Sequence, residues 1–129
     1  MRMKFLIGTA LVVGALAAST LGAVPTRRSA VVRFLRPTIV AGTFVLGTVV
    51  FEHDDEKMAR GKPCTTVYRY DANTNGRGEP IVAFMCLARE RPLATKFEAT
   101  LVQTVSWPDR LTEYQLAGER EGHGVPSWK

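Results

Sequence analysis

The sequence predicts an all-β protein: a small antiparallel β-sandwich or barrel of five to six strands with one short helix. β-branched and aromatic residues form runs of strand length, and clusters of turn residues separate these runs at short intervals. A single stretch carries helix-boundary signals, and the 129 residues suffice for one domain. We expect an N-terminal apolar targeting helix in front of this domain.

Residues 1–23 have the features of a secretory signal peptide. Arg2 and Lys4 precede an uncharged stretch from Phe5 to Val24, and small residues lie near its end. We expect cleavage near Ala23, with Ser19 as the alternative. An uncleaved membrane anchor is the other interpretation, because twenty uncharged residues can just span a bilayer. The protein is therefore expected to be exported, periplasmic or at the cell surface, or else anchored in the inner membrane.

Residues 24–36 are predicted to be a basic linker, and they account for most of the net charge of +5. From Pro37 onward, 11 Lys and Arg stand against 12 Asp and Glu, so the expected domain is nearly neutral. A basic pI is thus no argument for a nucleic-acid partner. The linker arginines suggest membrane contact through residues 5–36. Positive charge on this side of the apolar stretch also opposes export. A protein that faces the cytoplasm is therefore the third alternative, after a cleaved signal peptide and an outward-facing anchor.

The β domain is expected to span residues 37–118. Thr38 to Glu52 is rich in β-branched residues, and Gly42 and Gly47 interrupt it. This pattern predicts one bent strand or two short strands, with a bulge or turn at a glycine. A short strand at Val31 to Leu35 is a further expectation within the linker.

A very short helix is predicted within residues 53–63. Asp54 is the expected N-cap, and Asp55 and Glu56 place negative charge at the positive end of the helix dipole. Gly61 can adopt the left-handed conformation that ends the helix, and Pro63 prevents its continuation.

Residues Cys64 to Cys86 are predicted to form a β-hairpin, and the chain has no other cysteine. A three-residue loop at residues 74–76, with Gly76 left-handed, would place Cys64 directly opposite Cys86. Their Cα atoms would then be about 4.5–5.5 Å apart, a separation that suits a disulfide. Two unrelated buried thiols are the alternative.

This register makes a prediction about the aromatic residues of the hairpin. Thr66 should lie opposite Phe84 and Tyr68 opposite Val82, so that Tyr68, Tyr70 and Phe84 share the face of the cysteines. If exposed, these three side chains would form a binding patch for sugars, peptides or lipids. Burial as the core around the disulfide is the favoured interpretation.

Two more strands and a tail are expected after the hairpin. Residues 89–96 are predicted to be a charged loop, and the alternation in Phe97 to Val105 indicates a half-exposed strand. A turn at residues 106–110 leads to a last strand at Leu111 to Ala117. Residues 119–129 are predicted to form a flexible tail.

The densest polar cluster is a weak candidate for a metal site. It comprises His53, Asp54, Asp55 and Glu56, with His123 as a further ligand. Adjacent residues rarely point at one ion, and the capped helix explains most of the cluster, so we assign no metal. Copper binding by Met58, Cys64, Met85 and Cys86 is also disfavoured, because Met85 and Cys86 should point to opposite faces.

Catalytic machinery is not recognisable in the sequence. The serines lie in no nucleophile motif, and phosphate-loop and dinucleotide fingerprints are missing, so we expect no enzyme and no cofactor. The leading hypothesis is a non-catalytic binding or structural module that uses an exposed strand edge or loop. Its partner would be an unidentified protein or small ligand, not nucleic acid. The alternatives are a metal-binding periplasmic protein using the His53–Glu56 loop and a membrane-anchored accessory protein.

Overall fold

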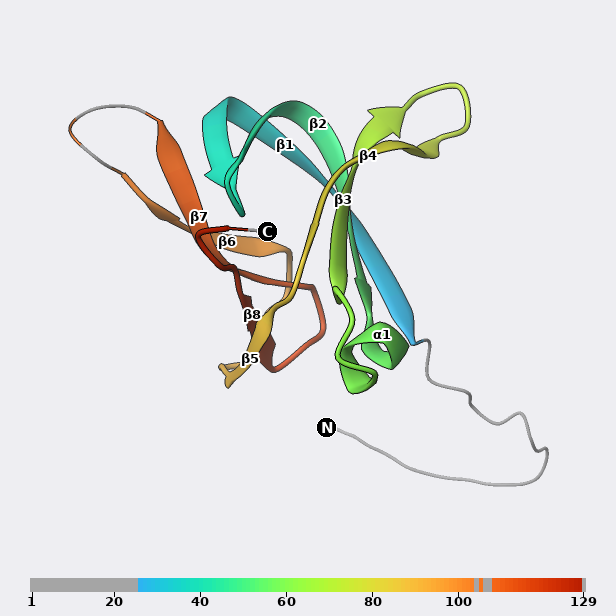
Figure 1. Ribbon diagram of the computed structural model, residues 1–129, viewed down its shortest axis with the longest axis vertical. Helices are drawn as coiled ribbons and strands as arrows, with labels where there is room; N and C mark the ends of the chain where they lie inside the picture. Colours follow the sequence, from blue (N-terminus) through green and yellow to red (C-terminus); the bar gives the residue numbers. More distant parts are fainter. Residues whose placement is uncertain (1–25, 104, 106–107, 129) are drawn as a thin grey trace.

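The computed structural model describes residues 26–103, 105 and 108–128 (Figure 1). These residues form eight strands and one short helix. In chain order the elements are β1 (Arg27–Val40), β2 (Thr43–Asp54), α1 (Asp55–Ala59), β3 (Thr65–Asp71), β4 (Gly76–Phe84), β5 (Leu87–Glu90), β6 (Glu98–Val102), β7 (Asp109–Gln115) and β8 (Glu121–Gly124).

The described strands belong to one sheet that has two halves. Its order is β4-β3-β2-β1-β7-β8-β5, and β6 pairs with β7. β7 pairs with β6 along one of its edges. Along the other edge, the start of β7 pairs with β1 and its end pairs with β8. The link between β1 and β7 is a short parallel pairing of Thr38 with Asp109 and Ile39 with Arg110. Strands β1–β4 and strands β5–β8 thus form two antiparallel halves joined at one corner (Figure 1).

The core lies between these two halves, because both contribute their buried side chains to one cluster. Phe51, Val67 and Phe84 come from the first half, and Leu111 and Tyr114 come from the second. The rings of Phe51 and Tyr114 meet edge to face with their centroids 5.1 Å apart. Aromatic contacts of this geometry stabilise a core beyond simple area burial.

The all-β prediction with one short helix is confirmed, but the strand count of five to six was too low. The prediction divides β5 between the hairpin and the loop at residues 89–96, and it places β8 in the tail and most of β1 in the linker. The predicted targeting helix, and with it residues 1–23, lies outside the described residues.

The predicted basic linker is wrong from Arg27 onward, since this stretch is the first half of β1. Phe34 is buried, and Ala30 and Val32 pack against the core, so every second residue faces inward. The turn expected at a glycine is confirmed. Ala41 and Gly42 have φ of 49° and 84°, as a two-residue hairpin turn with two left-handed positions requires.

The predicted short helix is confirmed together with its cap. The Asp54 carboxylate accepts hydrogen bonds from the backbone amides of Glu56 at 2.9 Å and Lys57 at 3.3 Å. Gly61 has φ of 70°, which is the left-handed conformation expected after the helix.

The Cys64–Cys86 disulfide is confirmed, although the predicted turn and register are wrong. The loop between the strands is residues 72–75, and Asn75, not Gly76, is left-handed with φ of 55°. The two cysteines lie just beyond the paired ends of β3 and β4, with Cα atoms 6.3 Å apart. A position outside the ladder makes the bridge less dependent on strand register than a cross-strand pair would be.

Because the register differs from the predicted one, Tyr68, Tyr70 and Phe84 do not form the expected aromatic patch. Thr66 faces Ala83 and Tyr68 faces Pro80, not the predicted Phe84 and Val82. Pro80 has no N–H to donate to the ladder, which fits the irregular pairing around it. Phe84 is 1% exposed in the core. The Tyr68 hydroxyl instead donates to Glu52 at 3.4 Å on the outer face of the sheet, so Tyr68, Tyr70 and Phe84 do not form one surface.

The predicted loop and flexible tail are also wrong, for one shared reason. β5 lies within residues that were partly assigned to the loop, and β8 lies within residues 119–129. The two strands pair with each other from Leu87–Gly124 to Glu90–Glu121, so each supplies the partner the other needs. The predicted strands after the loop are confirmed with shifted bounds, as β6 and β7.

Candidate functional site

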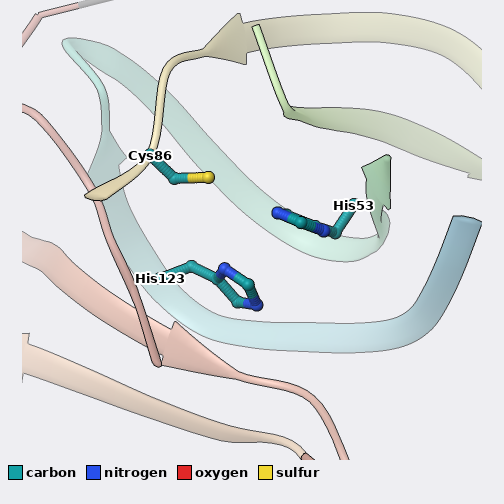
Figure 2. A group of neighbouring side chains, drawn as sticks. All are labelled: His53, Cys86 and His123. Carbon is teal, nitrogen blue, oxygen red and sulfur yellow. The ribbon is translucent and has the colours of Figure 1, made fainter. Parts of the chain in front are cut away.

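The chain's two histidines lie face to face in the interior. His53 is the last inward-facing residue of β2, and His123 lies in β8; both side chains are 0% exposed. Their ring centroids are 4.1 Å apart, although 70 positions separate them in the sequence. Figure 2 shows the two rings approaching each other from opposite elements.

The sheet topology brings these rings together. His123 pairs with Tyr114 in the β7–β8 ladder, and the Tyr114 ring packs against His123 at 4.9 Å. The Tyr114 hydroxyl shares a 2.5 Å hydrogen bond with Thr65, which precedes Val67 on β3. Because β8 pairs with β7, His123 lies against the inner face of the first half, where His53 of β2 also points.

Each imidazole has a carboxylate on one of its nitrogens. Nδ1 of His53 lies 3.2 Å from Oδ1 of Asp55, and Nε2 of His123 lies 3.1 Å from Oε1 of Glu119. Arg28 of β1 forms ion pairs with both carboxylates. One guanidinium therefore fixes the two acidic groups that face the two histidines.

The opposite nitrogens of the two rings are left without partners. Nε2 of His53 and Nδ1 of His123 are buried and form no hydrogen bond. Nδ1 of His53 also forms none, so its 3.2 Å contact with Asp55 is one of proximity and charge. Most buried polar atoms in proteins are hydrogen-bonded, and leaving one unpaired costs about 1–3 kcal/mol. Two such atoms in one place therefore suggest a binding role.

The sulfur of Cys86 completes the group. Sγ of Cys86 and one nitrogen each of His53 and His123 all lie within 4.8 Å of one another. Figure 2 shows the sulfur pointing toward the two rings from the connection between β4 and β5. In the structure this sulfur is bonded to Cys64, and the Cys86 amide donates to the Cys64 sulfur at 3.0 Å.

Burial favours the neutral form of both imidazoles. It lowers the pKa of His53 from 6.5 to about 4, and the neighbouring His123 adds to this effect while Asp55 opposes it. Burial also lowers the pKa of His123. A neutral imidazole has a free lone pair, and this is the form that binds metal ions.

The structure rearranges the weak metal candidates of the sequence. It brings His53 and His123 together, while Asp54 is used as the helix cap. Asp55 lies 3.2 Å from Nδ1 of His53 and is not part of the group that contains Cys86. The sequence considers Cys86 only as a copper ligand beside Met85 and does not pair it with the histidines. It gives no role to Arg28 and Glu119, which fall in the predicted linker and tail.

Comparisons with protein-family models, with curated proteins and with solved structures found no match. Support for a function therefore comes from the geometry of the chain itself. Within the described part of the chain, no helix has both the length and the apolar character needed to span a membrane.

Proposed function

We propose that this protein is a small, non-catalytic module that binds a transition-metal ion between His53 and His123. The observation that carries the proposal is the pairing of each imidazole. A carboxylate lies within 3.2 Å of one nitrogen of each ring, with a hydrogen bond only at His123, and the other nitrogen is buried and forms no hydrogen bond. One nitrogen of each ring and the Cys86 sulfur lie within 4.8 Å of one another.

This arrangement resembles the usual surroundings of metal-binding histidines. Such a histidine donates its other N–H to a carboxylate or carbonyl group, which fixes the ring orientation and raises its basicity as a ligand. Glu119 is hydrogen-bonded to His123 in this way, Asp55 lies 3.2 Å from Nδ1 of His53 without a hydrogen bond, and Arg28 forms ion pairs with both carboxylates. A pair of histidines used only for packing would not need two oriented carboxylates.

The donor set indicates the class of metal. Imidazole nitrogen and sulfur suit zinc and copper, whereas magnesium and calcium prefer oxygen ligands. The inner side of the pair offers nitrogen and sulfur, with no carboxylate in this group of three. We therefore expect a borderline or soft ion such as Zn²⁺ or Cu⁺.

The proposed setting is an exported one, in the periplasm or at the cell surface. The disulfide supports it, because disulfides persist in oxidising compartments. The signal-like residues 1–23 support it independently. Fractionation of cells tests this setting: full-length chain in the membrane pellet would instead support the anchored alternative.

Calorimetric titration with Zn²⁺ tests the proposal, using both the disulfide form and the anaerobically reduced form. We expect one ion per chain in at least one form, and we expect His53→Gln and His123→Gln each to remove this binding. Met85→Leu is the matched control, because Met85 is a sulfur-containing neighbour of Cys86 that is 48% exposed. Stoichiometric binding in neither form, or binding that survives both histidine substitutions, would contradict the proposal.

A binding module that uses an exposed surface is the second candidate. β6 lies at an edge of the sheet with all five residues exposed, and Leu35, Phe44 and Leu46 are exposed near the β1–β2 turn. Exposed apolar groups and free edges are typical of association sites. Sedimentation should then detect a dimer that Phe44→Ser weakens; a monomer at all concentrations would count against self-association.

A further inference from the structure

We infer that the Cys64–Cys86 disulfide is a redox gate on the metal site, with the Cys86 thiolate as the third ligand in the reduced form. The inference rests on the proposed function. It adds that the metal affinity depends on the oxidation state of the cysteines and that the two sulfurs have different roles.

The position of Cys86 supports its role as a ligand. Its sulfur and the nitrogens of His53 and His123 lie within 4.8 Å of one another. Ligand atoms around a tetrahedral zinc ion, at bond lengths of 2.0–2.3 Å, are roughly 3.3–3.8 Å apart. A contraction of at most about 1.5 Å would therefore bring the three atoms to the spacing of zinc ligands, and Figure 2 shows that they already face one another.

In the disulfide form, Cys86 cannot act as a metal ligand, so the gate is closed. A thiolate is the form of cysteine that binds metal, and a sulfur bonded to Cys64 carries no such charge. Reduction by an external dithiol transfers two electrons and two protons to the bridge and yields two thiols, while the dithiol becomes a disulfide. Cys86 then loses its proton when Zn²⁺ binds, so one proton is released and one metal–sulfur bond forms.

The surface near the bridge offers a route for the reductant. Cys64 is 2% exposed, whereas Cys86 is partly exposed and lines a surface hollow with Met85, Leu87 and Pro126. An incoming thiolate is therefore expected to attack the Cys86 sulfur, with Cys64 as the leaving group. The second thiol of the reductant then releases Cys86.

The location of the cysteines permits this change without unpairing the sheet. Cys64 precedes β3, and Cys86 lies between β4 and β5. Neither is a member of a strand, so their side chains can turn after reduction while the ladders of β3 and β4 remain paired. Cys64 lies outside the group of three ligand atoms and acts as the partner that closes the gate.

Two serine variants separate the roles of the sulfurs. Cys64→Ser and Cys86→Ser remove the same disulfide, so any general loss of stability is common to both. We expect Cys64→Ser to bind one Zn²⁺ without added reductant. We expect Cys86→Ser to bind it more weakly, by more than the roughly 10–100-fold that loss of an outer partner costs.

Native mass spectrometry of the full chain reads the bridge and the bound Zn²⁺ in one measurement. The expected result is zinc on the reduced wild-type protein and on Cys64→Ser, but not on the disulfide form. Equal zinc binding by the oxidised and reduced wild type would overturn the gate while leaving the proposed function intact. Equal binding by the two serine variants would overturn the role of Cys86, and no binding by any form would remove the proposed function itself.

Discussion

The protonation of His53 sets how the stability of the metal-free domain depends on pH. The folded protein keeps His53 neutral down to about pH 4, whereas the unfolded chain takes up the proton near pH 6.5. The unfolded state therefore binds more protons between these values, and the free energy of unfolding falls as the pH falls. At about 1.4 kcal/mol per pKa unit, the full loss is roughly 3 kcal/mol.

Urea unfolding at pH 7, 6 and 5 measures this effect. His123 acts in the same direction, while the lowered pKa of Glu113 matters only below its ordinary value of 4.5. Between pH 4.5 and 6.5, the change in the free energy of unfolding is therefore expected to come from the histidines. His53→Gln should flatten the curve in this window, and a wild-type stability that does not change between pH 7 and 5 would contradict the prediction.

A second prediction at the residue scale concerns the helix cap. Asp54→Ala should lower the free energy of unfolding by about 0.5–2 kcal/mol, because two backbone amides lose their acceptor. Asp54→Asn keeps an acceptor and is the matched control, so its loss should be clearly smaller. Asp55→Ala should also cost less than Asp54→Ala. An asparagine variant as unstable as the alanine variant would show that the side chain does not act as a cap.

At the scale of elements, β8 depends on a close approach to β7. Glu113 accepts two 2.7 Å hydrogen bonds from Arg91, and a Cβ at Gly122 would clash with the Glu113 carboxylate and lie 3.0 Å from Cγ of Arg91. Gly122→Ala should therefore destabilise the domain by about 1–3 kcal/mol. Gly76→Ala is the control, since its Cβ would be 3.8 Å from the nearest atom.

Chemical denaturation of both glycine variants is the appropriate measurement. Equal stability of Gly122→Ala and the wild type would mean that the pairing of β8 with β7 is looser than described. The test also bears on the candidate site, because His123 follows Gly122 directly.

The elements that could be predicted are those with local signals. Asp54 and Gly61 mark both ends of the short helix, and each acts through its own backbone surroundings. β5 and β8 have no such signals. Residues 121–124 contain two glycines, which are poor strand formers, and they become a strand because β5 and β7 lie on either side.

At the scale of the whole molecule, the disulfide joins the residue before β3 to the connection that leads from β4 into the second half of the sheet. For two cysteines with a sequence separation of 22, the chain-entropy model gives a stabilisation of roughly 3 kcal/mol. The paired β3–β4 hairpin reduces this stabilisation, because it already restrains the enclosed residues. Reduction should therefore lower the melting temperature without unfolding the domain. The Cys64→Ser/Cys86→Ser double variant should melt like the reduced protein, and identical melting of the oxidised and reduced forms would contradict a stabilising bridge.

The meeting of His53 and His123 could not be predicted in geometry, although both residues were candidates. Their contact depends on the two-residue parallel pairing of β1 with β7, which has no local sequence signal. The role of Glu119 could not be predicted for the same reason. Glu119 follows β7, and its ion pair with Arg28 of β1 forms only because the two halves of the sheet pack together. The sequence supplies the ligands, whereas the long-range topology decides which of them meet.

X-ray absorption at the zinc edge of the reduced, zinc-loaded protein tests the central claim most directly. The expected first shell contains nitrogen at about 2.0–2.1 Å and sulfur at about 2.3 Å, with imidazole scattering that decreases in His53→Gln and in His123→Gln. The sulfur contribution should disappear in Cys86→Ser. A shell of oxygen alone, unchanged by either histidine substitution, would contradict a metal site between His53 and His123.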